Sequence, residues 1–396
     1  MTKSYYEFFC PVKVVAGSAA LEHIPYELGN LSASRPLIIT DKGVRGAGLI
    51  DHVLNAFAES DMDVVDIFDD VPPDSSTKVV SQIAELYRSK NCDSIIAVGG
   101  GSVIDTSKGV NILVSENGHD LSEFSGVGVL KRPLKPFFVI PTTAGTGSEV
   151  TLVAVIADPD KSVKLPFTSY FLLPNAAILD PRMTLTLPPH ITAMTAMDAM
   201  THAIEAFCGM AKNPISDAYA ILAIRKISEN LMRVLDKPDD ADARLELAQA
   251  STMAGIAFSN SMVGLVHSLG HSLGALCHLP HGLCMNLFLP YVLEYNLEER
   301  GEVIGELLLY LAGAEVYART PAHERGTRAI AVIRQMRDEL NRRCKLPRTL
   351  AETGKVTQDQ LGKLADMALD DGSIIFNPVE VSREDALSVL NRAWGG

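Results

Sequence analysis

The segment ITAMTAMDAMTHAIEAF at residues 191–207 carries three ionisable side chains among residues that are otherwise small, apolar or threonine. Asp198, His202 and Glu205 are spaced by four and three residues, so a helix would place them on one face. Exposure of this helix face to solvent would be one explanation for its three ionisable residues. Burying an unpaired aspartate there would cost several kcal/mol, and a metal ion or a salt-bridge partner would remove that cost. An Asp and a His four residues apart can reach one cation, as the two histidines of an HExxH helix do.

A second segment, LVHSLGHSLGALCHLPHGLCMN at residues 265–286, is unusually rich in histidine. It holds four of the ten histidines of the chain within fifteen positions, namely His267, His271, His278 and His281. The first two would share a helix face, and His281 stands in a Pro-His-Gly turn that can aim its side chain back at that helix. Packing in the protein core would explain a single histidine. Four histidines in so short a segment, together with Asp198 and His202, indicate that some of the four bind a metal.

The donor types narrow the choice of metal without deciding it. One carboxylate with several imidazoles and no thiolate accepts Fe(II), Zn(II), Mn(II) or Co(II). Cys277 and Cys284 flank the histidine-rich segment, and thiolate ligation by either would favour zinc.

Two glycine-rich segments in the first half of the chain could bind an anion. In SIIAVGGGSVIDTSKGVNILV, at residues 94–114, Gly99, Gly100, Gly101 and Ser102 join an apolar strand to a helix, which suits a pyrophosphate at the helix N-terminus. The GxGxxG fingerprint of dinucleotide-binding proteins is absent. The alternative to an anion site is a tight strand-to-helix turn without a ligand. In VIPTTAGTGSEVT, at residues 139–151, the polar groups that follow a strand could contact a ligand or cap a helix. They are Thr142, Thr143, Thr146 and Ser148.

Asp41 follows the strand-like sequence LIIT. A carboxylate at that position can accept hydrogen bonds from a ribose diol and would repel the additional phosphate of NADP, so Asp41 favours NAD. An aspartate that caps the following helix explains the same residue.

The elements around these residues predict two domains. Short β-branched runs at residues 12–17, 36–40, 62–68, 93–101 and 135–143 alternate with helical patterns, as in a parallel sheet covered on both faces. After residues 176–180 the chain becomes rich in Ala, Met and Leu and should be helical. Pro188 and Pro189 place the boundary, so we expect an α/β domain at residues 1–188 and a helical domain at 189–396.

Composition excludes several classes of protein. A net charge of −13 without a basic stripe argues against a nucleic-acid partner. No run of apolar residues is long enough for a membrane span or a signal peptide, and residues 253–277 read instead as a buried helix. The six cysteines lack regular spacing, which fits a reducing compartment. We therefore expect a cytoplasmic protein.

Several motifs in order resemble the iron-containing, or group III, alcohol dehydrogenase family over nearly the whole chain. They are GGGSVIDTSKG, PTTAGTGSEVT, AILDPRMTLTLPP, MDAMTHAIEAF, NPISDAYA and VHSLGHSLGALCHLPHG. The resemblance implies a dehydroquinate synthase-like architecture, in which a Rossmann-like parallel sheet forms an N-terminal dinucleotide-binding α/β domain and the C-terminal domain is all-α. It also implies a site in the cleft between the domains and a homodimer or larger homo-oligomer.

The resemblance also implies roles for particular residues. Asp198, His202, His267 and His281 would be the metal ligands, and His271 would be a catalytic neighbour close to substrate and nicotinamide. The cofactor contacts would be Asp41, Gly99 to Ser102, Thr142, Thr143 and Lys164. The expected cofactors are NAD in preference to NADP and a divalent metal, Fe(II) ahead of Zn(II) or Mn(II). The expected reaction is reversible hydride transfer between a small primary alcohol or diol and NAD, giving the aldehyde.

The sequence departs from the family at two places. Pro72, Pro73 and Asp74 stand where many members carry Asn-Pro-Thr near the adenine and ribose. Leu276, Cys277 and His278 stand where an aromatic residue is common, and His278 could compete as a ligand.

Three alternative functions fit parts of this sequence. A polyol or hydroxy-acid dehydrogenase or reductase would use the same fold. A lyase of the dehydroquinate synthase type would need a basic cluster for its phosphorylated substrate, and the metal segments contain none. A binding or regulatory protein without turnover would not need the full set of metal-type residues.

Overall fold

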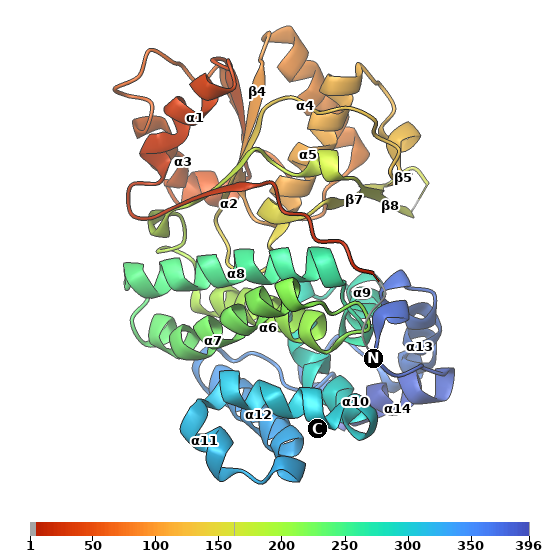
Figure 1. Cartoon of the computed structure of the whole chain (residues 1–396). Coiled ribbons are helices and arrows are strands. Elements are labelled where there is room, and N and C mark those ends of the chain that lie inside the picture. The colour runs from red at the N-terminus through yellow and green to blue at the C-terminus, as the bar shows by residue number, and fades with distance from the viewer. Residues whose placement is uncertain (1–4, 162, 396) are drawn as a thin grey trace. The chain divides into compact units, whose positions relative to one another are not determined.

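The computed structural model describes residues 5–161 and 163–395, which form two compact units. One unit consists of Cys10–Leu187 with Asp239–Thr252, and the other contains residues 5–9, Pro188–Pro238 and residues 253–395 (Figure 1). Two segments therefore depart from the predicted ranges. Residues 5–9 belong to the helical unit, and residues 239–252, which include the first part of helix α8 (Ala241–Ser261), belong to the α/β unit.

The α/β unit is built on a six-stranded parallel sheet, as predicted for the fold class. Its order is β1-β9-β6-β4-β2-β3. The strands are β1 (Lys13–Ala16), β9 (Ala176–Leu179), β6 (Phe137–Pro141), β4 (Ser94–Gly99), β2 (Pro36–Ile39) and β3 (Asp66–Phe68). From β2 the chain first goes to β3 on one side and then crosses to β4 on the other. The carboxyl ends of β2 and β4 therefore flank a topological switch point, where open α/β sheets bind ligands.

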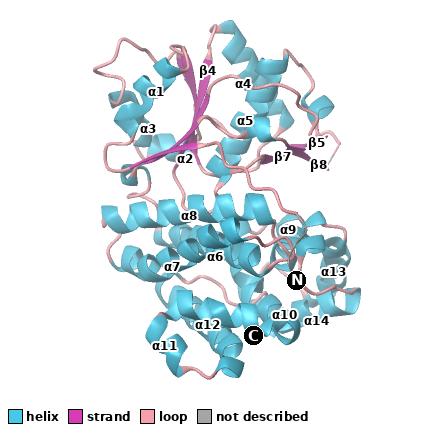
Figure 2. Ribbon diagram, viewed as in Figure 1, coloured by secondary structure: helices cyan, strands magenta, loops and turns pink. Residues whose placement is uncertain are grey.

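Alternate residues of the central strands face two separate hydrophobic cores. Leu37 and Ile39 of β2 pack in one core with α4 (Thr77–Ser89) and α5 (Gly101–Glu116). Ile38 packs in the other core with α1 (Ile24–Asn30) and α3 (Leu49–Asn55). Figure 2 shows these two helix pairs on opposite faces of the sheet. Because both faces are covered, the strands read as continuous apolar runs in the sequence.

A second, three-stranded sheet in the same unit was not predicted. Its order is β5 (Gly126–Val127), β8 (Val163–Thr168) and β7 (Val153–Asp158), with β7 and β8 antiparallel. The residues of β8 are mostly exposed or half-buried, so this strand lacks the apolar pattern that marks the main sheet.

The helical unit contains the long helices that the second half of the sequence predicts. They are α6 (Pro189–Cys208), α7 (Pro214–Asp236), the end of α8, α9 (Leu265–Cys277), α10 (His281–Ala312), α12 (Arg325–Cys344), α13 (Leu361–Leu369) and α14 (Arg383–Gly395). Helix α6 packs against α7 and α10, and α9 packs against α10 and α13. These contacts bring the start of α9 and the start of α10 to the middle of α6.

The stretch at residues 253–277 is mostly buried but is not one helix. Helix α8 ends at Ser261 and α9 begins at Leu265, with Met262 between them at a φ of 63°. A membrane-spanning helix is absent from the part of the chain that the structure describes.

Candidate functional site

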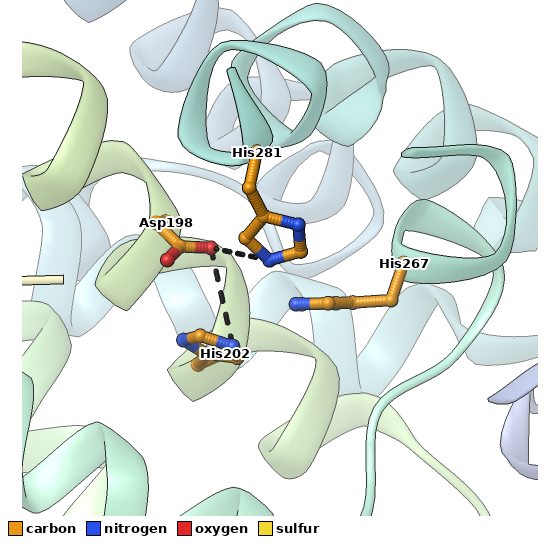
Figure 3. Close-up of side chains that lie close together, drawn as sticks. All are labelled: Asp198, His202, His267 and His281. Carbon is orange, nitrogen blue, oxygen red and sulfur yellow. Dashed lines mark ion pairs between the residues drawn. The ribbon is translucent and has the colours of Figure 1, made fainter. Parts of the chain in front are cut away.

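Four predicted side chains converge within the helical unit (Figure 3). Asp198 and His202 come from α6, His267 from α9 and His281 from α10. One donor atom from each residue lies within 4.8 Å of the others. Asp198 Oδ1 is 3.3 Å from His281 Nε2 and 3.9 Å from His202 Nε2.

The cluster is mostly buried, so a solvated face does not explain the ionisable residues of α6. Asp198, His202 and His267 are buried, whereas the His281 side chain is 41% exposed. Among the described residues, Asp198 Oδ1 and His267 Nε2 are buried without a hydrogen-bond partner. Buried polar atoms normally have hydrogen-bond partners, and buried atoms without one that point at a common centre fit a cation.

Burial and the proximity of the four side chains to one another together determine the protonation state of the cluster. Burial lowers the pKa of His202 to about 3 and the pKa of His267 well below its ordinary value, so both imidazoles are neutral at pH 7. Burial would raise the pKa of Asp198, but the surrounding imidazoles outweigh this effect and the pKa falls below its ordinary value. A carboxylate beside neutral imidazoles is the protonation state that metal binding requires.

Local packing brings His281 to α6. The predicted Pro-His-Gly turn is the start of α10, with Pro280 as N-cap and His281 as the first helical residue. A Cβ atom on Gly282 would lie 2.4 Å from the Met194 carbonyl oxygen of α6. Only glycine permits this close approach, which holds His281 beside Asp198.

His271 lies next to the cluster, one turn beyond His267 on α9. Its ring centroid is 5.7 Å from that of His267 and 5.4 Å from that of His281. The His271 Nδ1 atom is 2.8 Å from Asp371 Oδ2, in a pair whose side chains are 42% and 22% exposed. Burial would raise the pKa of Asp371, but the hydrogen bond with His271 holds it below its ordinary value.

Two carboxylates that the sequence analysis did not assign to the site contact these histidines. Asp371 is one hundred residues from His271 in the chain, and no local signal marks it. Glu205 was recognised only as a third ionisable residue on the face of α6. Its Oε2 atom is 2.5 Å from His267 Nδ1.

Three flanking residues lie outside the cluster of four that the described residues form. His278 is the C-cap residue of α9 and has a φ of 51°. Cys277 and Cys284 are buried thiols, and burial raises the pKa of both, that of Cys284 to about 12. Neither thiol belongs to the cluster, so the structure does not support the thiolate ligation that the sequence left open.

In the α/β unit, three predicted cofactor segments follow three adjacent strands. Asp41 follows β2, Gly99 to Ser102 lead from the last residue of β4 into α5, and Thr142 and Thr143 follow β6. Helix α5 begins at Gly101, so its N-terminal N–H groups lie at this sheet edge. A Cβ on Gly100 would lie 3.4 Å from Thr143 Oγ1, which shows how closely the second and third segments approach.

Three of the predicted cofactor residues, Asp41, Ser102 and Lys164, have different surroundings. Asp41 caps α2 (Lys42–Gly46), because its Oδ1 accepts a hydrogen bond of 2.9 Å from the Val44 N–H. The Ser102 hydroxyl donates to the carbonyl of Pro73. Lys164 is an exposed residue of β8, in the smaller sheet. Lys164 lies opposite Ala157 of β7.

A buried lysine that sequence reasoning did not single out supports the loop after β6. Lys108 of α5 is fully buried, and its Nζ donates to the carbonyl oxygens of Thr151 and Val153 at 2.9 and 2.8 Å. One turn earlier, Asp105 accepts from Ser148 Oγ and the Val155 N–H at 2.9 and 3.0 Å. These contacts tie the segment that follows Thr143 to the helix that begins at Gly101.

Two family models match consecutive parts of the chain. Residues 11–181 match "Iron-containing alcohol dehydrogenase", and residues 192–394 match "Fe-containing alcohol dehydrogenase family, C-terminal".

Relatives and a solved structure agree with these matches over the full length. The chain is 35% identical to the NAD-dependent methanol dehydrogenase of Bacillus methanolicus, covering 98% of this chain and 99% of that protein. It is 34% identical to the 1,3-propanediol dehydrogenase of Citrobacter freundii over 100% of both. A 1,3-propanediol oxidoreductase structure superposes with a TM-score of 0.93 at 32% identity, covering 98% of this chain and 100% of that chain. The chain therefore belongs to the iron-containing alcohol dehydrogenase family.

Proposed function

We propose that the protein is a metal-dependent alcohol dehydrogenase that transfers a hydride between a small primary alcohol or diol and NAD, giving the aldehyde. The observation that carries this proposal is the convergence of one carboxylate and three imidazoles from α6, α9 and α10 within 4.8 Å. Family membership supports the class of reaction. The relatives named for methanol and 1,3-propanediol support a small alcohol or diol as substrate.

Asp198, His202, His267 and His281 would hold a divalent cation. Their oxygen and nitrogen donors suit Fe(II), which the family name favours, and also Zn(II) or Mn(II). When bound, the cation would supply Lewis-acid chemistry, lowering the pKa of an alcohol hydroxyl and polarising an aldehyde carbonyl. The partial exposure of His281 leaves the cluster open to a small molecule on that side.

His271 would move the proton. Its Nδ1 is engaged by Asp371, so Nε2 is the nitrogen that takes up the hydroxyl proton during oxidation and returns it during reduction. The exposure of the His271 side chain allows proton exchange with water. Asp371 would orient the imidazole and stabilise its protonated form.

The segments after β2, β4 and β6 would hold NAD. The N–H groups at the start of α5 would bind the pyrophosphate, and the absence of side chains at Gly99, Gly100 and Gly101 would allow close approach. Asp41 uses one carboxylate oxygen for its helix cap, which leaves the other oxygen for a ribose hydroxyl. Thr142 and Thr143 at the neighbouring strand end would add hydroxyl contacts. Lys164 is proposed from family resemblance alone.

The proposal is tested by purifying the protein without added metal, measuring its metal content, and assaying reduction of NAD and NADP with short alcohols, diols, polyols and hydroxy acids. We expect bound divalent metal, loss of activity on chelation with recovery on adding Fe(II), and the fastest NAD reduction with a short primary alcohol or diol. Full activity in metal-free protein would contradict the metal centre. A clear preference for hydroxy acids would contradict the substrate class.

A further inference from the structure

We propose that Glu205 is a positioning residue that orients His267 and fixes which of its ring nitrogens carries the proton. This inference rests on the proposed metal centre. Glu205 is on the same face of α6 as Asp198 and His202, yet it is not a member of the four-residue cluster. It acts on the cluster through His267.

The Glu205 carboxylate spans two groups at the start of α9. Its Oε1 accepts a hydrogen bond of 2.7 Å from the Val266 N–H, and its Oε2 lies 2.5 Å from His267 Nδ1. The side chains of Glu205 and His267 are only 7% and 3% exposed. Water therefore does not compete for either contact.

The first contact provides the cap that α9 lacks locally. The N-cap position is Gly264, which has no side chain to accept from the first N–H groups of the helix. A Cβ on Gly264 would lie 3.3 Å from Glu205 Oε1, so glycine leaves room for a carboxylate from another helix. A negative charge at this position also interacts favourably with the helix dipole.

The second contact determines the geometry of His267. An ionised Glu205 only accepts hydrogen bonds, and with it the imidazole proton lies on Nδ1 and the lone pair on Nε2. That Nε2 atom is the buried nitrogen that has no hydrogen-bond partner among the described residues and points toward Asp198 and His202 (Figure 3). Helix α6 thus supplies two members of the cluster and orients a third that α9 supplies.

Glu205→Gln tests this inference while keeping the size of the side chain. The amide oxygen can still accept from the Val266 N–H, but the amide nitrogen then faces His267 Nδ1 and donates to it. This moves the ring proton to Nε2, the wrong nitrogen for a ligand. We expect the affinity of metal-free protein for Zn²⁺, measured by competition with a chelator, to fall about 10–100-fold. Glu205→Asp, which keeps the carboxylate, should recover part of that loss.

The matched control is Glu294→Gln. Glu294 of α10 is a partly buried carboxylate that pairs with Arg334 at 2.8 Å and lies outside the cluster. This variant should bind Zn²⁺ as the parent does. A His267→Ala variant separates the two proposals. If it binds Zn²⁺ as tightly as the parent, the metal centre is wrong; if it loses Zn²⁺ while Glu205→Gln does not, only the role of Glu205 is wrong.

The histidine tautomer gives a second readout that needs no variant. In the metal-free parent labelled with ¹⁵N-histidine, we expect the NMR signals of His267 to show a protonated Nδ1 and an unprotonated Nε2. The Glu205→Gln variant should show the reverse. A protonated Nε2 in the parent would overturn the inference, even if the variant failed to fold.

Discussion

Helix α9 supplies the histidines of two carboxylate–histidine pairs one turn apart, and the two pairs differ chiefly in exposure. In the Glu205–His267 pair both side chains are less than 8% exposed, whereas in the Asp371–His271 pair they are 22% and 42% exposed. The Nδ1 atom of the histidine contacts the carboxylate in both pairs. A contact between a carboxylate and an imidazole therefore occurs once in a buried environment and once in a solvent-exposed one.

This difference suggests how one helix could serve two tasks. A buried imidazole that cannot exchange its proton with water is suited to hold a lone pair in a fixed direction. An exposed imidazole beside a carboxylate can gain and lose a proton during each turnover. Solvent access, rather than residue type, separates the proposed ligand from the proposed proton carrier.

Removing the buried histidine should have the largest effect. His267→Ala takes away a proposed ligand, so its Zn²⁺ affinity should fall by more than the roughly 10–100-fold expected when only an orienting partner is lost. Competition with a chelator measures this change. The His271→Ala variant is the matched comparison. Equal losses of affinity in the two variants would remove the distinction between the pairs.

Removing the exposed histidine should impair turnover while leaving metal binding intact. We expect kcat of His271→Ala to fall about 10²–10⁴-fold, the range for loss of a general acid–base group. Metal content by atomic spectroscopy should match that of the parent. A variant that keeps the parental kcat would show that His271 does not carry the proton.

The orienting carboxylate of the exposed pair should matter less than its histidine. In Asp371→Asn the amide nitrogen can donate to His271 Nδ1, which would leave the proton on the wrong nitrogen. We expect kcat to fall about 10-fold with little change in KM. Steady-state kinetics with a short alcohol checks this expectation, and a fall as large as that of His271→Ala would contradict an indirect role.

Asp41 extends the comparison to a carboxylate that pairs with a backbone N–H instead of a histidine. Asp41→Asn keeps the oxygen that caps α2 but removes the charge, so the preference for NAD over NADP should fall roughly 10-fold with little loss of stability. Asp41→Ala should show the same shift and also lose about 1 kcal/mol of stability. Ratios of kcat/KM and thermal unfolding measure the two effects. An unchanged cofactor ratio would remove Asp41 from the ribose site.

The smallest expected effect is on stability at low pH. Because the pKa of Asp371 is lower in the folded chain than its ordinary value of 3.8, this carboxylate stabilises the fold above that pH. The contribution is lost as the pH falls below about 4 toward the folded-state pKa. The metal-free parent should therefore lose stability more steeply than Asp371→Asn in that range. Parallel unfolding midpoints from pH 6 to pH 3 would contradict this sign.

Residue spacing in the sequence was sufficient to predict features whose residues lie in the same helix or strand. Asp198 and His202 could be paired from the sequence because a helix repeat places them on one face. The central strands could be recognised because burial on both faces requires continuous apolar runs. The smaller sheet could not, because β5 has only two residues and the residues of β8 are mostly exposed or half-buried.

Contacts between distant elements could not be predicted in the same way. Four histidines at residues 267–281 have similar local surroundings, and family register rather than spacing selected His267 and His281. Neither the 61-residue separation of Glu205 and Val266 nor the 100-residue separation of His271 and Asp371 leaves a local pattern.

By itself, the sequence determined the α/β and helical character of the two halves, the family, and the pair of ionisable groups on α6. The tertiary structure decided which histidines face that pair and which carboxylates contact them. It also decided which of the two carboxylate–histidine contacts of α9 is buried. The physical reason is that residue spacing specifies direction only within a helix or strand. The packing of α6, α9 and α10 sets the burial and the approach of side chains that come from different helices.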